Sequence, residues 1–154
     1  MNLKLVVTDM DGTFLNNEGT FDMESFHLLK NQMTEKDIKF VFCTGKQCER
    51  VEALIGEHTN DVYIIASEDS WIDITKQGIN KGTTINKIQE HLGIEISETI
   101  AFGDGLNDID LFKAAKYKVA MDNAYPELKA QANLIAKNND ESGVIKTLQL
   151  LIND

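Results

Sequence analysis

The sequence predicts an α/β fold: an open, mostly parallel, Rossmann-like sheet with helices on both faces. Short apolar runs rich in β-branched residues alternate with segments whose apolar residues recur at helical spacing. The connections between them are short, and several apolar runs end in glycine or polar residues. Strands that alternate with helices along a chain form parallel sheets with helices packed against their faces.

The first strand is expected over residues 3–8, and a polar connection, 14–20, follows it. A helix is expected over 22–35, because Phe26, Leu29 and Met33 share one helical face and Asp22 is suited to cap its N-terminus. Further apolar runs predict strands over 38–43, 62–66, 99–102, 118–121 and 133–136. Further periodic segments predict helices over 47–57, 81–91, 109–115 and 142–152, and a short helix beginning near Pro126.

Length and charge limit the kinds of protein this chain can be. Its 154 residues suit a single domain, 1–154. Fifteen basic against 25 acidic residues give a net charge of −10, so nucleic acid is not an expected partner. No apolar run reaches the roughly 18 residues of a membrane span, and the N-terminus has no signal-peptide pattern, so we expect a cytoplasmic protein. Cys43 and Cys48 are expected to be plain thiols.

The first strand ends in two aspartates, Asp9 and Asp11, followed by a Gly-Thr turn. Residues two apart in a strand project to the same side, so these carboxylates should be neighbours that repel each other unless a cation relieves them. A simple Asp-Gly turn is the alternative. Lys81 opens a helix, where its charge opposes the helix dipole, so an anionic neighbour would explain it better than a solvated surface position would.

The carboxyl ends of parallel strands lie at one edge of a sheet, so polar residues after different strands should converge there. Hard oxygen ligands suit Mg²⁺, and a lysine and a threonine suit a phosphate group. Carboxylates, a lysine and a threonine together supply the groups needed for attack by a carboxylate on phosphorus. The residues expected at this edge are Asp9, Asp11, Thr44, Lys81, Asp104, Asn107 and Asp108.

Five motifs in order resemble the haloacid dehalogenase superfamily of phosphohydrolases, and within it the Cof-type branch. They are Asp9-Met-Asp-Gly-Thr13, Cys43-Thr-Gly-Lys46, Gly78-Ile-Asn-Lys-Gly-Thr83, Gly103-Asp-Gly-Leu-Asn-Asp108 and Val119-Ala-Met-Asp-Asn-Ala124. The resemblance implies a Mg²⁺-dependent phosphomonoester hydrolase that acts through an aspartyl phosphate on small phosphorylated metabolites such as sugar phosphates.

The resemblance also implies a role for each matching residue. Asp9 would be the nucleophile and Asp11 the general acid and base. Thr44 and Lys81 would bind the phosphoryl group. Asp104, Asp9 and the Asp11 carbonyl would hold the metal, with Asp108 supporting it from outside. Further substrate contacts would come from Met10, Gly45 and Asn107.

The chain departs from the family pattern in two places. Lys46 stands where relatives usually carry arginine, which removes a planar guanidinium. Two-domain relatives insert a cap after the third strand, whereas 13 residues, 68–80, separate Ser67 from Lys81 here. The cap insertion expected near 67–72 is absent. The site should therefore be open to solvent, unless a neighbouring subunit of a homo-oligomer covers it.

Two other interpretations remain open from the sequence. A receiver-type signalling module also gathers acidic residues, a threonine and a lysine around Mg²⁺, but the order of these residues along the chain argues against it. A non-catalytic core kept for assembly is the second, and the intact pair of aspartates argues against that.

Overall fold

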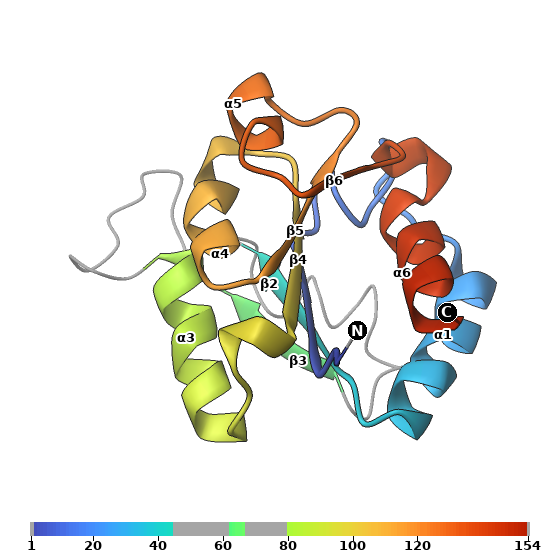
Figure 1. Cartoon of the computed structure of the whole chain (residues 1–154). Helices are drawn as coiled ribbons and strands as arrows, with labels where there is room; N and C mark the ends of the chain where they lie inside the picture. The colour runs from blue at the N-terminus through green and yellow to red at the C-terminus, as the bar shows by residue number, and fades with distance from the viewer. Residues whose placement is uncertain (1, 45–61, 67–79, 154) are drawn as a thin grey trace.

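The computed structural model describes residues 2–44, 62–66 and 80–153. These residues form one parallel sheet with helices on both faces (Figure 1). The strands are β1 (Leu5–Thr8), β2 (Lys39–Thr44), β3 (Val62–Ala66), β4 (Thr99–Gly103), β5 (Tyr117–Met121) and β6 (Leu134–Ala136). The α-helices are α1 (Met23–Glu35), α3 (Lys81–Leu92), α4 (Ile109–Lys113), α5 (Pro126–Lys129) and α6 (Gly143–Asn153). The helix predicted over 47–57 lies outside the described residues.

The sheet places β1 between β2 and β4, in the order β3-β2-β1-β4-β5-β6. Neighbouring strands are parallel, and Thr8 at the end of β1 lies opposite Phe42 on β2 and Phe102 on β4. The predicted open parallel sheet is confirmed. The receiver interpretation is wrong, because receiver modules have the order 2-1-3-4-5.

The helices form two layers around the sheet. In Figure 1, α3 and α4 lie on one face, and α1 and α6 pack together on the other. The side chains of β1 and most of those of β2 and β4 are buried between these layers, as expected for strands in the middle of a doubly covered sheet. Within the described ranges, no helix is both long and apolar enough to cross a membrane.

The ends of two helices follow from local sequence. Oδ1 of Asp22 accepts the N–H of Ser25 at 3.0 Å, which confirms Asp22 as the N-cap of α1. Gly93 ends α3 with φ 66°, a left-handed conformation that glycine adopts without a steric penalty. At the other end of α3, Asn80 caps the helix that presents Lys81.

The connection after Asp9 is more deeply buried than the sequence predicts. Residues 14–20 read as a polar connection, but Phe14 and Leu15 are buried, with 3% and 1% of their surface exposed. The N–H groups of both residues donate to the carbonyl of Met10, which turns the chain back toward the sheet. The Phe14 ring then packs against the rings of four other phenylalanines, with centroids 4.8 to 5.9 Å away: Phe21, Phe26, Phe40 and Phe42.

Gly143 should be essential for the docking of α6. A Cβ at this position would lie 1.9 Å from the carbonyl oxygen of Lys137. We expect Gly143→Ala to lower the free energy of unfolding by about 1–3 kcal/mol, the usual cost of overpacking. Urea unfolding measures the loss. Leu150→Ala is the control, because Leu150 is 69% exposed on the same helix and should change stability little. Equal stability of the two variants would contradict this account.

Candidate active site

Asp9 lies at the carboxyl edge of the sheet, one residue beyond β1. Its N–H donates to the carbonyl of Phe102 on β4 at 3.1 Å, so its backbone is tied to the neighbouring strand. The next two residues are no longer part of β1, and the alternation of a strand does not reach Asp11. This explains why Asp9 is partly buried whereas Asp11 is exposed.

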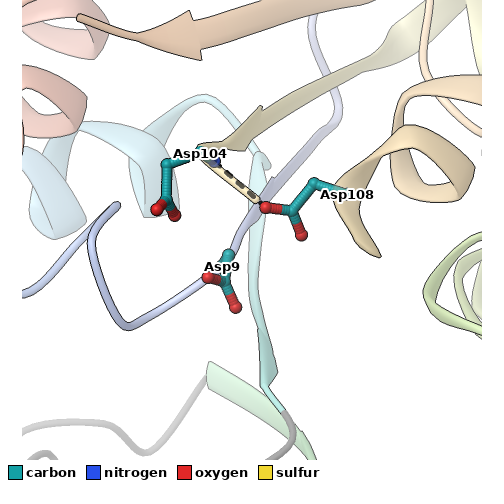
Figure 2. A group of neighbouring side chains, drawn as sticks. All are labelled: Asp9, Asp104 and Asp108. Atoms are coloured by element: carbon teal, nitrogen blue, oxygen red, sulfur yellow. Dashed lines mark hydrogen bonds between the residues drawn. The ribbon is translucent and has the colours of Figure 1, made fainter. Parts of the chain in front are cut away.

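Three carboxylates converge at this edge of the sheet. One oxygen from each of Asp9, Asp104 and Asp108 lies within 4.8 Å of the others, and Figure 2 shows these side chains directed toward a common space. The N–H groups of Asp104 and Gly105 both donate to Oδ2 of Asp108 at 3.0 Å. Asp108 is fully buried and held in one orientation by these bonds. The sequence prediction that these aspartates meet is confirmed.

Lys81 is the cation of this cluster. Its Nζ lies 2.8 Å from Oδ1 of Asp9 and 2.6 Å from Oδ1 of Asp108, and only 13% of its side chain is exposed. The anionic neighbours predicted for this lysine are therefore present, and a solvated surface position is ruled out. Gly82 lets the first turn of α3, which carries Lys81, pack closely against α4, because a Cβ at Gly82 would lie 2.2 Å from the carbonyl oxygen of Asp110.

Burial and charge shift the pKa values of these groups. Burial raises the pKa of Asp9 from 3.8 to about 7, against the charge of Lys81, while the charge of Asp108 raises it further. Burial alone would lower the pKa of Lys81, but Asp9 and Asp108 raise it above its ordinary value, so the ammonium stays charged. Burial also raises the pKa of Asp104, opposed by its hydrogen bond from Thr13. The charge of Lys81 therefore does not offset the effect of burial on the pKa of Asp9.

Two residues of the Asp9 turn fit against Asp104. Oγ1 of Thr13 donates to Oδ1 of Asp104 at 2.5 Å. Gly12 has φ 74°, and a Cβ there would lie 2.4 Å from Oδ2 of Asp104, so only glycine allows this approach. The sequence prediction assigned no role to Thr13. Its hydroxyl, placed two residues after Asp11, is the signal that could have identified it.

The remaining predicted residues lie at different depths around the cluster. Thr44 is buried at the carboxyl end of β2, the edge where it was expected. The side chain of Met10 is fully buried and belongs to the core, so only its main chain could contact a substrate. Asn107 is exposed on the 3-10 helix η3 (Leu106–Asp108). Gly45 lies outside the described residues. The exposed Asp11 is close enough to raise the pKa of Asp104 but lies outside the three-carboxylate group.

Comparison with known proteins identifies the class to which this fold and site belong. The model of the haloacid dehalogenase-like hydrolase family matches residues 6–68 and 46–148. The chain therefore belongs to the haloacid dehalogenase-like hydrolase family, as its motifs predict.

Individual relatives cover different shares of the chain. It is 43% identical over 139 residues to YkrA of Bacillus subtilis, a match that covers 84% of this chain and 53% of YkrA. It is 32% identical over 96 residues to Phosphatase YwpJ of Bacillus subtilis, which covers 62% of this chain and 34% of YwpJ. The chain thus spans only part of the length of these relatives.

Solved structures show the same fold at lower identity. SMU.1108c from Streptococcus mutans superposes with a TM-score of 0.83 at 21% identity, covering 99% of this chain and 100% of that one. The 3-deoxy-D-manno-octulosonate 8-phosphate phosphatase from Moraxella catarrhalis gives a TM-score of 0.77 at 22% identity, covering 99% and 87%. That structure is a complex with a magnesium ion, a phosphate ion and a KDO molecule.

The raised pKa of Asp9 predicts an unusual dependence of stability on pH in the metal-free protein. Between pH 4 and 7 the folded state holds a proton on Asp9 that the unfolded chain has released, so the free energy of unfolding should fall as pH rises through this window. Asp9→Asn removes this titration. In EDTA, urea unfolding at pH 4.5, 6 and 7.5 should show the variant gaining stability relative to the parent as pH rises. A constant difference between the two proteins would contradict the raised pKa.

Proposed function

We propose that this chain is a Mg²⁺-dependent phosphomonoester hydrolase that acts through an aspartyl phosphate on Asp9. The observation that carries the proposal is the ammonium of Lys81, which bridges Asp9 and Asp108 beside Asp104 at the carboxyl edge of the sheet. Small phosphorylated metabolites such as sugar phosphates are the proposed substrates. The phosphatase names of relatives such as YwpJ support the reaction class, and the phosphate and magnesium ions bound by the Moraxella catarrhalis neighbour support the ligands.

The residues of the cluster fit a divalent cation. Three carboxylates and one ammonium leave an excess of two negative charges when all are ionised. Both oxygens of Asp108 are engaged by Lys81 and by two N–H groups, whereas Asp9 and Asp104 each use a single oxygen in these bonds. We therefore assign Asp9 and Asp104 as Mg²⁺ ligands, with Asp108 orienting the site, and we add the main-chain carbonyl of Asp11 because the family motif implies it. Bound Mg²⁺ would neutralise charge on the phosphoryl oxygens.

The proposed reaction has two steps. An oxygen of Asp9 attacks phosphorus while the bond to the leaving oxygen breaks, and Asp11 gives that oxygen its proton. Asp11 then takes a proton from water as the water oxygen attacks phosphorus, which releases phosphate and restores the Asp9 carboxylate. Lys81 and Thr44 hold the phosphoryl oxygens, and Asn107 with the main chain of Met10 and Gly45 completes the contacts. The exposure of Asp11 suits a group that must reach both a leaving group and water.

We further propose that the chain is a single catalytic core, 1–154, without a cap domain. The family model matches residues 6–68 and 46–148, two segments that overlap, and the sequence departs from the pattern of two-domain relatives near 67–72. Residues 67–79, which contain this junction, lie outside the described residues. An uncapped core would accept a range of small phosphomonoesters, because a cap supplies the contacts that distinguish leaving groups. A neighbouring subunit would be the other way to cover the site.

Asp9→Asn should abolish Mg²⁺-dependent hydrolysis of p-nitrophenyl phosphate, because an amide is a poor nucleophile and a weaker metal ligand. Release of p-nitrophenol with Mg²⁺ and with EDTA measures the effect. Asp110→Asn is the matched control, since Asp110 is a nearby aspartate outside the cluster that pairs with Lys113. The control should keep the parent's activity. Full turnover by Asp9→Asn would remove Asp9 as the nucleophile.

Lys81→Ala should lower kcat/KM by about 10²–10³, because it removes a charge that stabilises the transferring phosphoryl group. The variant should fold but unfold at lower urea, since fully buried Asp108 loses its cation. Lys113→Ala is the control, as that lysine is 69% exposed. Steady-state kinetics and urea unfolding on both variants test the assignment. Parent-like kcat/KM in Lys81→Ala would exclude Lys81 from the reaction.

A further inference from the structure

Residues in the C-terminal third of the chain form hydrogen bonds with the turn that carries Asp9. We define the Asp9 loop as residues 9–17. Asn123, in the turn after β5, donates from Nδ2 to the carbonyl of Gly12 at 2.7 Å. Oδ1 of the same side chain accepts the N–H of Asn139, which lies after β6, at 3.1 Å. Both polar ends of the Asn123 amide are therefore used to join the Asp9 loop to a second segment.

The second segment, Asn139 and Asp140, forms hydrogen bonds with the C-terminal part of the Asp9 loop. Asn139 is only 5% exposed, and its Nδ2 donates to the carbonyl of Leu15 at 2.9 Å. Its neighbour Asp140 accepts the N–H and the Nδ2 of Asn17 at 2.8 and 2.6 Å. A buried amide with its partners in place fixes the conformation of the backbone around it. The Asp9 loop is thus held at Gly12, at Leu15 and at Asn17.

The turn after β5 also holds the other half of the acidic cluster. Two residues beyond Asn123, the N–H of Tyr125 donates to the carbonyl of Asp104 at 3.0 Å. The same short turn therefore binds one carbonyl in the Asp9 loop and one at the end of β4. The two halves meet closely, since Gly12 lies against the Asp104 carboxylate and Thr13 donates to it. A shift of Gly12 would move Asp9 and Asp104 relative to each other.

We propose that Asn123 is a positioning residue, which sets the Asp9 loop against Asp104 and so fixes the spacing of the two carboxylates. This role rests on the proposed function for its effect on catalysis, but its effect on the loop is independent of any activity. Partners that orient metal-binding groups typically contribute 10–100-fold to metal affinity or activity. Asn123 lies at the surface, so its truncation should leave the core intact.

The test compares Asn123→Ala with Asn133→Ala. Asn133 is a matched control, because its side chain accepts the N–H of Lys118 at 2.8 Å and joins β5 to β6 without touching the Asp9 loop. Hydrogen exchange, read by mass spectrometry on the metal-free proteins, should be faster over residues 9–17 in Asn123→Ala alone. Isothermal titration with Mg²⁺ should give a dissociation constant about 10-fold higher, and kcat should fall more than KM rises.

A second variant tests whether the Nδ2 donor of Asn123, rather than the size of its side chain, holds the loop. Asn123→Asp keeps the size and the acceptor but loses the N–H that binds Gly12, so its loop should exchange as fast as that of Asn123→Ala. Parent-like exchange over residues 9–17 in Asn123→Ala, or equal acceleration in Asn133→Ala, would overturn the proposal. If the parent hydrolyses no phosphomonoester, the proposed function fails, whereas hydrogen exchange still decides whether Asn123 positions the loop.

Discussion

The electrostatic contact between one ammonium and two aspartates is the constraint on which this site depends. Carboxylates this close repel one another, and Asp108 is buried where an unpaired charge would be costly. Lys81 and two backbone N–H groups offset that cost for Asp108, but Asp9 keeps a pKa near 7. The fold therefore engages both oxygens of Asp108, while burial keeps the pKa of the proposed nucleophile Asp9 raised despite the charge of Lys81. A divalent cation bound beside Asp9 would supply further positive charge to this carboxylate.

The parallel sheet makes this contact possible for residues that are distant in sequence. Asp9 follows β1 and Asp104 follows β4, and these strands are neighbours although 90 residues lie between the end of β1 and the start of β4. Lys81 comes from the first turn of α3, and close packing at Gly82 lets that turn approach α4. No local segment contains the site. Its geometry is a product of strand order and helix packing, so changes in either should disturb the cluster before they disturb the individual elements.

Much of the fold and of the cluster could be predicted from residue pattern. Apolar runs ending in Asp, Gly or Thr identified the strands and the edge where Asp104 and Asp108 meet Asp9, and an ill-placed helix-start lysine indicated an anionic neighbour. The burial of Phe14 could not be predicted, because it depends on turn bonds to Met10 and on rings from other elements. The motif Val119-Ala-Met-Asp-Asn-Ala124 included Asn123 but suggested no role for it, because its hydrogen bonds to Gly12 and Asn139 depend on how distant segments pack together.

Two sets of contacts fix the Asp9 loop, and this bears on how a core without a cap could work. In the first set, the Phe14 ring packs against the rings of Phe26 and Phe42. In the second set, the side chains of Asn123 and Asn139 donate to the carbonyls of Gly12 and Leu15. Both supports come from the core itself. The position of Asp9 relative to Asp104 therefore requires no second domain, and a cap would contribute to selectivity and to the exclusion of water rather than to assembly of the reacting groups. In such a design, catalytic geometry and substrate choice can be changed separately.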